Sequence, residues 1–530
     1  MERYELIVVG AGPAGLSAAI EAAKAGMRVI VFDENAKPGG QLFKQIHKFF
    51  GSKEHKAKIR GFRIGEALLA EASALGVTVC LNATVMGIFA NKEITVMVDD
   101  RIEHVKADSI VIATGASENM IPFEGWTLPG VIGAGAAQTM MNLHGVKPGE
   151  RILMVGSGNV GLVVSFQLKQ AGCEVAAVVD ASPRVGGYGV HAAKVARTGV
   201  PFYMAHTVVR ALGETHVTGA VIAQVDKNWK IIEGSEKHID ADTICLAVGL
   251  SPMSQLARMA GCEMEDNRLK GGYVPVCDAS GETSVPGIFA AGDVAGIEEA
   301  SSAMVQGRIA GAAAAMNSGY MSQDDYLKIY DELQGSLSKL RQGMFCHANK
   351  GRTDLTETDE GYALSGTLLS SGYIGEAELS AFPCAAGQGS GAHVVIECTQ
   401  NIPCNPCQDA CPKGCITVGD CITSLPQLDE TVSCSGCGLC VAACPGQAIF
   451  LVDEDIGGGY ASVTIPYEFL PYPQAGDTGT ALDRSGAAVC PAQVIGIKAA
   501  KGYDSTALLT MRVPKDMAGK ARFYKNGGAA

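Results

Sequence analysis

The stretch Glu5-Leu-Ile-Val-Val-Gly-Ala-Gly-Pro-Ala-Gly15 decides the fold of the N-terminal part of this chain. Its apolar run is typical of a buried strand and leads into the spacing G-x-G-x-x-G, after which Leu16 to Ala25 has the pattern of a helix. A second apolar run then ends in the acids Asp33 and Glu34. The order of strand, glycine turn, helix and strand predicts a parallel sheet that binds a nucleotide.

The same design recurs later in the chain. Arg151-Ile-Leu-Met-Val-Gly-Ser-Gly-Asn-Val-Gly161 again carries a strand into the glycine spacing, and the next strand ends in Asp180. The offset from the first glycine to the acid is 24 residues in both copies, if Gly10 is counted to Glu34 and Gly156 to Asp180. This duplication predicts two dinucleotide-binding domains more strongly than either glycine motif alone.

In each copy the glycines would allow a tight turn, a close approach of a pyrophosphate, and packing of helix on strand. The helix N-terminus would stabilise the phosphates, and the acid would accept hydrogen bonds from the ribose hydroxyls. The residues expected at the first site are Gly10, Gly12, Pro13, Ala14, Gly15, Thr114, Gly115 and Asp33 or Glu34. Those expected at the second site are Gly156, Gly158, Asn159, Gly161, Asp180 and Gly249.

Further motifs indicate which dinucleotide each site takes. Pro38-Gly-Gly-Gln-Leu42, which contains Gly40, Gln41 and Leu42, and the later pair Gly292 and Asp293 favour FAD at the first site. An aspartate between a strand and a helix can hold ribityl hydroxyls. At the second site Asp180 would bond a ribose 2′-hydroxyl and repel a 2′-phosphate, which favours NAD; the nearby Arg184 keeps NADP as the alternative.

Composition excludes several classes of protein. The 530 residues include 47% hydrophobic and 18% charged residues, which rules out a disordered chain. The formal net charge of −13, without a basic block, argues against nucleic acid as a partner. No apolar run approaches the roughly 18 residues of a membrane helix, so no membrane insertion is expected. The chain enters a strand at Tyr4, which leaves no room for a signal peptide and predicts a cytoplasmic protein.

Ten of the 18 cysteines lie between Cys398 and Cys444. Such a local cluster in a long chain indicates metal rather than disulfides. Within it, Cys434-Ser-Gly-Cys437-Gly-Leu-Cys440-Val-Ala-Ala-Cys444-Pro445 has the spacing of a 4Fe–4S motif. A zinc site would need only two C-x-x-C pairs.

A second, less regular motif precedes it. Aligning Cys411-Pro412 with Cys444-Pro445 leaves Asn401 where the other motif has its first cysteine. One cluster is therefore expected to use Cys411 with the three thiolates of the regular motif, namely Cys434, Cys437 and Cys440. The other would use Cys404, Cys407, Cys444 and a fourth thiolate, for which the candidates are Cys398, which is favoured, Cys415 and Cys421.

The predicted fold class is α/β, with two doubly wound, Rossmann-like dinucleotide-binding domains, a small ferredoxin-like 4Fe–4S domain and a β-rich C-terminal tail. The expected boundaries are 1–117 with 285–325 for the FAD-binding domain and 118–284 for the NAD-binding domain. A connector at 326–395, the 4Fe–4S domain at 396–455 and the tail at 456–530 follow.

Residues 1–325 resemble the two-dinucleotide flavoproteins related to thioredoxin reductase, which share Gly39-Gly-Gln-Leu42 and Ala291-Gly-Asp293. Those reductases carry a C-x-x-C dithiol before the second glycine motif; residues 129–138 here contain no cysteine, so dithiol exchange is not expected. Residues 121–131 and 134–138 resemble a narrower group. That group is the FAD/NAD (alpha-type) subunit of hetero-oligomeric amino- and imino-acid dehydrogenases and oxidases, including sarcosine oxidase alpha, opine oxidase, hydrogen cyanide synthase and proline or hydroxyproline dehydrogenases. Residues 396–450 resemble bacterial two-cluster ferredoxins.

This resemblance implies an iron–sulfur flavoprotein that moves electrons among NAD(H), FAD and two 4Fe–4S clusters, with no catalytic side chain of its own. It implies a hetero-oligomer in which a second flavoprotein subunit oxidises the amine and a carrier such as ferredoxin accepts electrons. Relatives often carry a 2Fe–2S domain of different cysteine spacing, which weakens any inference about substrate. The alternatives are a stand-alone NADH:acceptor reductase using ferredoxin, quinone or a dye, and an electron-wire subunit with an inert nucleotide site.

Overall fold

The computed structural model describes residues 2–89, 91–342, 366–382, 384, 391–429 and 431–527. The chain forms two compact units, Met1–Asn119 with Gly249–Arg352, and Met120–Val248 with Thr353–Ala530. The sequence analysis predicts that the chain re-enters the first domain at residue 285, after the inserted second domain. In the structure the chain re-enters the first unit at Gly249. The reason is local pairing, because β16 (Leu250–Pro252) pairs antiparallel with β7 (Ala116–Glu118). Part of the predicted connector, at 343–365, 383 and 385–390, lies outside the described residues.

The first unit is built on a mixed sheet. Its strand order is β3 (Thr78–Cys80), β2 (Val29–Phe32), β1 (Glu2–Val9), β6 (Arg101–Ile112), β5 (Glu93–Val98) and β4 (Ala83–Ile88), with β19 (Ile288–Ala290) also paired to β6. The strands β1, β2, β3, β6 and β19 run parallel, and β4 and β5 are antiparallel additions. All four residues of Val29–Phe32 are buried, as expected for a parallel strand covered on both faces.

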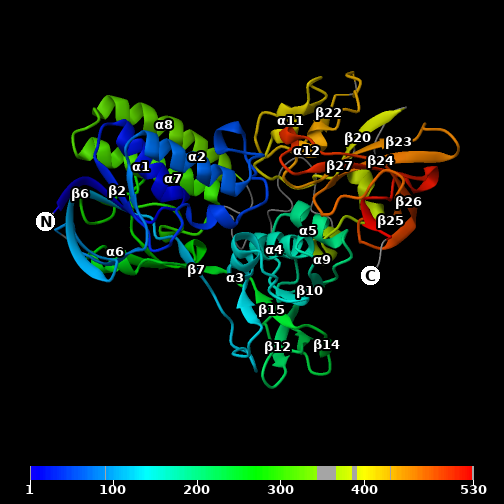
Figure 1. Ribbon diagram of the computed structural model, residues 1–530, viewed down its shortest axis with the longest axis horizontal. Helices are drawn as coiled ribbons and strands as arrows, with labels where there is room; N and C mark the ends of the chain where they lie inside the picture. The colour runs from blue at the N-terminus through cyan, green and yellow to red at the C-terminus, as the bar shows by residue number, and fades with distance from the viewer. Residues whose placement is uncertain are drawn as a thin grey trace. The chain divides into compact units, whose positions relative to one another are not determined.

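Helices α1 (Pro13–Lys24), α2 (Gly61–Ala74), α7 (Ala300–Asn317) and α8 (Gln323–Leu340) lie together on one side of this sheet (Figure 1). Alternate strand residues such as Leu6, Val8 and Phe289 point into the core under α1 and α7. On the other face, residues of β1 and β2 form a second core together with residues of β4 and β5, the antiparallel strands of the same sheet, and of the short α6 (Gln255–Met259). The expected nucleotide-binding layers of the first half of the fold are therefore confirmed.

Close packing of α1 on α7 depends on two glycines. A Cβ on Gly307 would stand 2.1 Å from the Ala14 carbonyl oxygen, and one on Gly311 would stand 2.2 Å from that of Ala18. Both contacts are with backbone, so neither can be relieved by a rotamer change.

The substitution Gly311→Ala is therefore expected to destabilise the first unit by about 2 kcal/mol, since it forces two helices apart. Gly335→Ala is the matched control, because Gly335 is exposed on the outer side of α8 and has nothing within 4 Å of the added Cβ. There, removing a helix glycine is expected to stabilise by roughly 0.5–1 kcal/mol. Thermal unfolding of both variants and of the parent protein measures the two changes in Tm. Equal changes of the same sign would show that the close contact of α1 with α7 does not depend on Gly311.

The second unit begins with a parallel sheet of order β11 (Phe202–Met204), β10 (Glu174–Asp180), β9 (Arg151–Val155), β15 (Thr243–Leu246) and β8 (Val131–Gly133). Its helices are α3 (Ala134–Gln138), α4 (Asn159–Gln170) and α5 (Gly189–Ala196). A small antiparallel sheet, β12 (His206–Leu212), β13 (Gly219–Gln224) and β14 (Lys237–Ile239), is inserted before β15.

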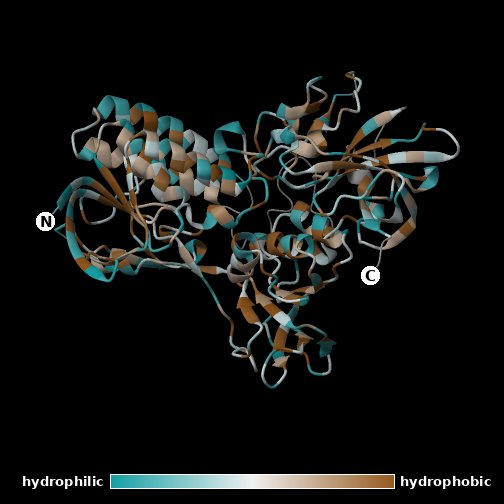
Figure 2. Cartoon of the chain, in the orientation of Figure 1, coloured by the Kyte–Doolittle hydropathy of each residue, from teal (hydrophilic) through white to brown (hydrophobic). Residues whose placement is uncertain are grey.

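The C-terminal half of this unit contains a seven-stranded antiparallel sheet. Its order is β20 (Ala392–Ile396), β23 (Ile449–Asp453), β24 (Tyr460–Tyr467), β27 (Ala507–Pro514), β26 (Ala488–Lys498), β25 (Thr478–Leu482) and β28 (Phe523–Asn526). The predicted β-rich tail is thus confirmed, and it continues the sheet started by the two strands that flank the cysteines. Apolar residues concentrate in these strands and in the parallel strands (Figure 2).

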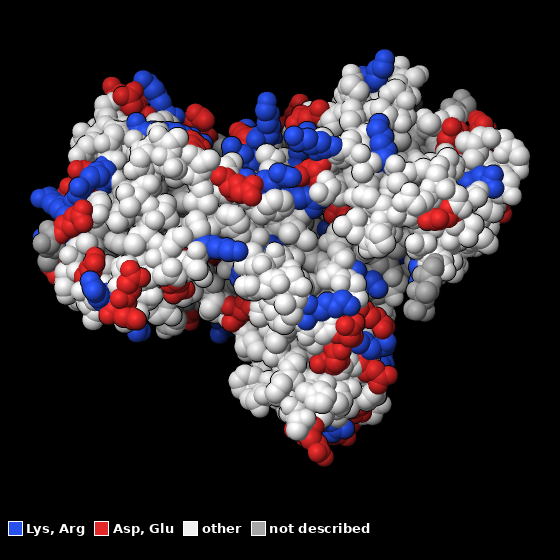
Figure 3. Space-filling view, viewed as in Figure 1, with Lys and Arg blue, Asp and Glu red and all other residues white. Residues whose placement is uncertain are grey.

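Two surface properties complete the description. Basic and acidic side chains are interspersed over the face drawn in Figure 3. Among the described helices, none has both the length and the apolar character needed to cross a membrane.

Candidate cofactor and metal sites

The first glycine loop follows β1 and has three distinct glycine environments. Gly10 has φ +104°, and a Cβ there would lie 2.4 Å from the Ala113 carbonyl oxygen. A Cβ on Gly15 would lie 1.8 Å from the Gly10 carbonyl oxygen, so this glycine packs α1 on the strand. Gly12 has nothing within 4 Å of an added Cβ, which leaves open space at the N-terminus of α1. Open space beside helix N–H groups suits a phosphate.

The second glycine loop, between β9 and α4, repeats the same three environments. Gly156 has φ +112° and faces the Ala247 carbonyl oxygen, which an added Cβ would approach to 2.2 Å. A Cβ on Gly161 would lie 2.1 Å from the Gly156 carbonyl oxygen, and Gly158 again has nothing within 4 Å. Both loops therefore have the backbone shape that a pyrophosphate requires.

The acids at the ends of β2 and β10 hold these loops in place. Asp33 Oδ2 accepts a hydrogen bond from the backbone N–H of Ala11 at 2.7 Å, and Asp180 Oδ2 accepts one from Ser157 at the same distance. Asp33 is thus the counterpart of Asp180, and Glu34 is exposed. The offset is 23 residues in the first copy and 24 in the second, because a register shift in β10 adds a residue between Val175 and Ala177. This corrects the equal spacing that the sequence suggested through Glu34.

The glycine pair Gly39 and Gly40 contacts the first glycine loop. The Gly39 N–H donates to the Ala11 carbonyl oxygen at 2.8 Å, and a Cβ on Gly40 would lie 2.9 Å from the Gly12 Cα. In the turn that follows, Leu42 is fully buried and Gln41 is exposed. The pair therefore brings the Gly40 backbone close to the open position at Gly12.

A second glycine pair, missed in the sequence, crosses the second loop. The Gly186 N–H donates to Ser157 Oγ at 3.0 Å, and the Tyr188 N–H donates to Asn159 Oδ1 at 2.7 Å. Each pair starts six residues after its acid, at Gly39 after Asp33 and at Gly186 after Asp180. The repeated Asp-x5-Gly-Gly spacing was the signal that could have revealed it.

The remaining predicted first-site residues lie at the carboxyl ends of β6 and β19. Gly292 has φ +77°, and a Cβ there would lie 2.9 Å from the Ala14 side chain, so Gly292 and Asp293 adjoin the start of α1. Thr114 Oγ1 donates to the Met253 carbonyl oxygen at 2.7 Å, and Gly115 has φ +72°. The structure places Gly249 in the first unit, where its carbonyl oxygen accepts from the Asn119 N–H at 3.0 Å.

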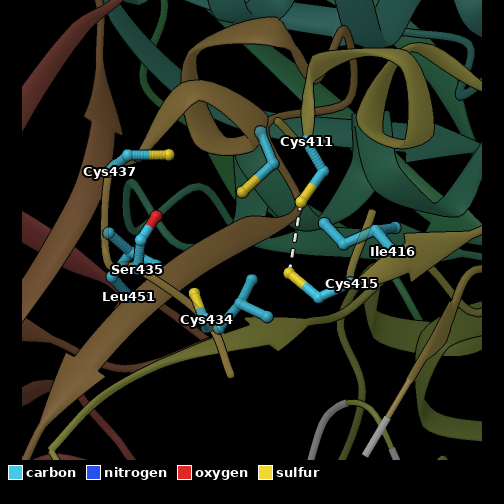
Figure 4. Close-up of a pocket in the computed structure, with 10 residues that line it drawn as sticks. Cys411, Cys415, Ile416, Cys434, Ser435, Cys437 and Leu451 are labelled. Carbon is cyan, nitrogen blue, oxygen red and sulfur yellow. Dashed lines mark hydrogen bonds between the residues drawn. The ribbon is translucent and has the colours of Figure 1, made fainter. Parts of the chain in front are cut away.

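Five cysteines line one cavity in the second unit: Cys411, Cys415, Cys434, Cys437 and Cys440. The sulfur atoms of the four that are labelled point toward a shared space (Figure 4). Cys411 Sγ and Cys415 Sγ are 3.1 Å apart. Burial raises the pKa of the Cys440 thiol, and burial together with the hydrogen bond to Cys411 raises that of Cys415 to about 12. This first cysteine set contains all four predicted ligands of one cluster and one additional thiol.

Cys398, Cys407 and Cys444 form a second cysteine set. Burial raises the pKa of Cys398, and the mutual repulsion of its charge with those of Cys444 and Cys407 adds to the shift. Burial and Cys444 raise the pKa of Cys407 to about 12. Of the candidate fourth ligands, Cys398 therefore lies with this set and Cys415 with the first.

Two further cysteines lie in turns, Cys404 before α11 (Pro406–Ala410) and Cys421 between β21 (Ile416–Thr417) and β22 (Gln427–Leu428). The Cys404 N–H donates to the Ile422 carbonyl oxygen at 3.0 Å, which ties the two turns together. Cys421 Sγ lies 3.1 Å from Thr423 Oγ1, a contact within its own turn.

The donor chemistry fits iron–sulfur centres. Among the described residues, no three His, Cys, Asp or Glu side chains converge as the ligands of a single metal ion would. In a cubane each cysteine binds a different iron, so the four sulfurs stand further apart than the ligands of one ion. The raised pKa values of these cysteine thiols describe the protein without iron. Coordination to iron deprotonates a cysteine and holds it as thiolate. The two cysteine sets fit this description, and their thiols are buried or half-buried except for the exposed Cys437.

Comparison with known proteins identifies relatives of the N-terminal three fifths. The profile of the family described as pyridine nucleotide-disulphide oxidoreductase matches residues 4–319. One of the opine oxidase subunits of Agrobacterium tumefaciens (strain Ach5) is 32% identical over 343 residues, 59% of this chain and 65% of that protein. The HcnB subunit of hydrogen cyanide synthase from Pseudomonas aeruginosa is 31% identical, covering 57% of this chain and 69% of its own. The alpha subunit of sarcosine oxidase from Corynebacterium sp. (strain P-1) is 30% identical over 60% of this chain and 33% of its own.

Solved structures match over a similar range. The L-proline dehydrogenase of P. horikoshii is 22% identical and covers 63% of this chain and 59% of its own, with a TM-score of 0.48. The thioredoxin reductase of T. acidophilum is 21% identical over 63% of this chain and 99% of its own, with a TM-score of 0.49. The chain spans just under two thirds of the length of the opine oxidase subunits from two species, at 65% and 64%.

Proposed function

Because the chain belongs to the pyridine nucleotide-disulphide oxidoreductase family, we propose that it is an iron–sulfur flavoprotein oxidoreductase that transfers electrons among NAD(H), FAD and two 4Fe–4S clusters. The observation that carries this proposal is the duplicated glycine loop, in which Gly12 and Gly158 both face open space. Both cysteine sets lie in the same compact unit as the second loop, which supports a role in passing electrons onward.

In this proposal the chain's residues bind and orient the cofactors. The N–H groups at the start of α1, beside Gly12 and Gly40, hold the FAD pyrophosphate, and Asp33 with Asp293 accepts hydrogen bonds from its sugar hydroxyls. At the second site Gly158 and Asp180 do the same for NAD(H). When bound, the flavin exchanges a hydride with nicotinamide and single electrons with iron–sulfur centres.

The cluster ligands we propose are the two cysteine sets. Cys411, Cys434, Cys437 and Cys440 hold the first centre. Cys398, Cys404, Cys407 and Cys444 hold the second. Support comes from the shared cavity of the first set and the mutual electrostatic interaction of Cys398, Cys407 and Cys444 in the second.

We further propose that the chain is the electron-transfer subunit of an amino- or imino-acid dehydrogenase complex. The names of the relatives support this, since the matched opine oxidase, hydrogen cyanide synthase and sarcosine oxidase chains are each named as one subunit of an enzyme. A second flavoprotein would then oxidise the amine, and a carrier such as ferredoxin would accept electrons. Mild anaerobic affinity purification from the native host tests this; isolation of the chain without a second flavoprotein would count against the complex and favour a stand-alone NADH:acceptor reductase.

A second candidate function is an electron-wire subunit whose second nucleotide site is inert. Anaerobic mixing with NADH separates the two functions: bleaching of the flavin supports a working nucleotide site, and an unchanged spectrum supports the wire.

Nucleotide preference gives a sharper test of Asp180. Asp180→Ser removes the charge that would repel a 2′-phosphate and shortens the acceptor of the 2′-hydroxyl. NADH should reduce the flavin with a KM about tenfold higher, because a charge-assisted hydrogen bond is worth roughly 1.5–3 kcal/mol. The KM for NADPH should fall or stay constant. Glu34→Ser is the matched control and should change neither the KM for NADH nor the KM for NADPH. A loss of NADPH use in Asp180→Ser would contradict the role of Asp180 at the ribose 2′ position.

A further inference from the structure

Helix α5 (Gly189–Ala196) connects the second glycine loop with the second cysteine set. Its N-terminal end follows Tyr188, whose N–H donates to Asn159 of the loop at 2.7 Å. The Gly189 N–H donates to Gln400 Oε1, two residues beyond Cys398. At the other end Arg197 caps the helix and donates to the Gln447 carbonyl oxygen at 2.9 Å, three residues beyond Cys444. The helix is therefore fixed at both ends to chain segments that carry cysteines of one set.

Arg197 is a buried cation in this contact. Its exposed fraction is 5%, its second hydrogen bond reaches Gln447 Oε1 at 3.4 Å, and its guanidinium lies 5.4 Å from the centre of the Phe450 ring. Burial lowers the pKa of Arg197 to about 10, so the side chain stays charged at neutral pH, and it interacts electrostatically with Cys444. A buried charge is not screened as a surface charge is.

Other buried charges surround the same place. Glu397, directly before Cys398, accepts hydrogen bonds from Arg484 and Arg522, each with a closest N–O distance of 2.6 Å. Arg522 lies 5.1 Å from the centre of the Phe450 ring. Glu468 also interacts with Arg197. The charged cluster therefore has three cations and two anions, a net charge of 3 − 2 = +1; its members are Arg197, Arg484, Arg522, Glu397 and Glu468. Removing Arg197 would make it neutral.

The first cysteine set has a different electrostatic setting. The charges that act on Cys440 come from the thiols of its own set, and the cation that interacts with Cys437 is Lys498, which is exposed. Cys437 itself is exposed. The potential of an iron–sulfur centre depends on net charge, hydrogen bonds to sulfur and solvent exposure. Reduction adds one negative charge, which a buried neighbouring cation stabilises.

We propose that Arg197 raises the reduction potential of the centre held by the second cysteine set, an inference that rests on the proposed function. The nucleotide-binding part of the chain thereby supplies a residue that tunes an iron–sulfur centre. Arg197 acts through charge and does not contact a reacting group of the substrate.

The test is a redox titration of the anaerobically purified full chain, followed by EPR. Arg197→Gln should lower the midpoint potential of one centre by at least 59 mV, a tenfold change in a one-electron equilibrium. The other centre should not move. Cys437→Ala, which alters the first centre, identifies the two signals: the centre that Arg197→Gln shifts must be the one that Cys437→Ala leaves intact.

Two further variants separate charge from packing. Arg197→Lys keeps the positive charge, so the midpoint potential of the second centre should stay close to that of the wild type. This variant also provides a test if Arg197→Gln does not fold. Lys194→Met is the matched control, because Lys194 is a buried cation on the same helix that faces Phe166. Three results would overturn the role of Arg197 and leave the proposed function standing. They are an unchanged midpoint potential in Arg197→Gln with a full complement of iron, a fall in midpoint potential in Arg197→Lys as large as that in Arg197→Gln, and the same fall in Lys194→Met. A wild-type chain without iron would overturn the proposed function as well.

Discussion

Replacing Gly12 by valine is expected to give a folded protein that has lost FAD. Gly12 has φ −76° and ψ −175°, an extended conformation that valine adopts readily, and nothing lies within 4 Å of an added Cβ. The new side chain therefore costs the fold little but fills the position where the pyrophosphate meets the backbone. We expect FAD affinity to fall at least a hundredfold, which corresponds to about 2.8 kcal/mol. Flavin content after gel filtration and a titration of the apoprotein with FAD measure the loss.

The second loop supplies the matched control. Gly158 has φ −67° and ψ 172°, and it too has nothing within 4 Å of an added Cβ. Gly158→Val should keep the yellow colour and lose reduction of the flavin by NADH, while dithionite still reduces it. A Gly12→Val protein with full FAD content, or a Gly158→Val protein that loses FAD instead, would contradict the assignment of the two loops.

Removing Cys440 is expected to halve the iron content, from about eight to about four atoms per chain. Cys440 is 7% exposed, lies on α12 (Leu439–Ala443) and lines the cavity of the first cysteine set. A cubane that loses a buried ligand has no water-accessible substitute at that corner, so the first centre should be lost. Iron analysis with anaerobic EPR measures the number of centres that remain.

Cys415→Ala is the control for this change, since Cys415 lines the same cavity but is not among the proposed ligands. It should retain about eight iron atoms. Full iron in Cys440→Ala, or loss of a centre in Cys415→Ala, would mean that a different four of the five thiols bind the cluster.

Local sequence patterns predicted the parts of the fold that depend on local backbone geometry. The glycine spacing at Gly10, Gly12 and Gly15 requires a strand, a turn and a helix, and the structure has β1 and α1 in those positions. The β-rich tail predicted at 456–530 contains β24 (Tyr460–Tyr467). Such signals are contained within a dozen residues, so no knowledge of distant contacts is needed.

Features that depend on distant contacts were not predictable in the same way. The sequence left Asp33 and Glu34 as alternatives, because the extra residue in β10 that makes Asp33 the counterpart of Asp180 follows from the pairing of β10 with β9. Cys415 was a candidate ligand of the second centre, yet it lies 3.1 Å from Cys411 Sγ and lines the cavity of the first cysteine set. Arg197 carried no motif, because its partner Gln447 is 250 residues away.

The most direct test of electron transfer from NADH through flavin to iron is an anaerobic titration of the oxygen-protected protein with NADH, followed by visible absorbance and EPR on the same samples. We expect a yellow-brown protein whose flavin absorbance bleaches as the EPR signals of reduced iron–sulfur centres appear. A protein without flavin or iron absorbance, or one whose flavin bleaches while EPR shows no reduced iron centre even after excess NADH, would contradict this expectation.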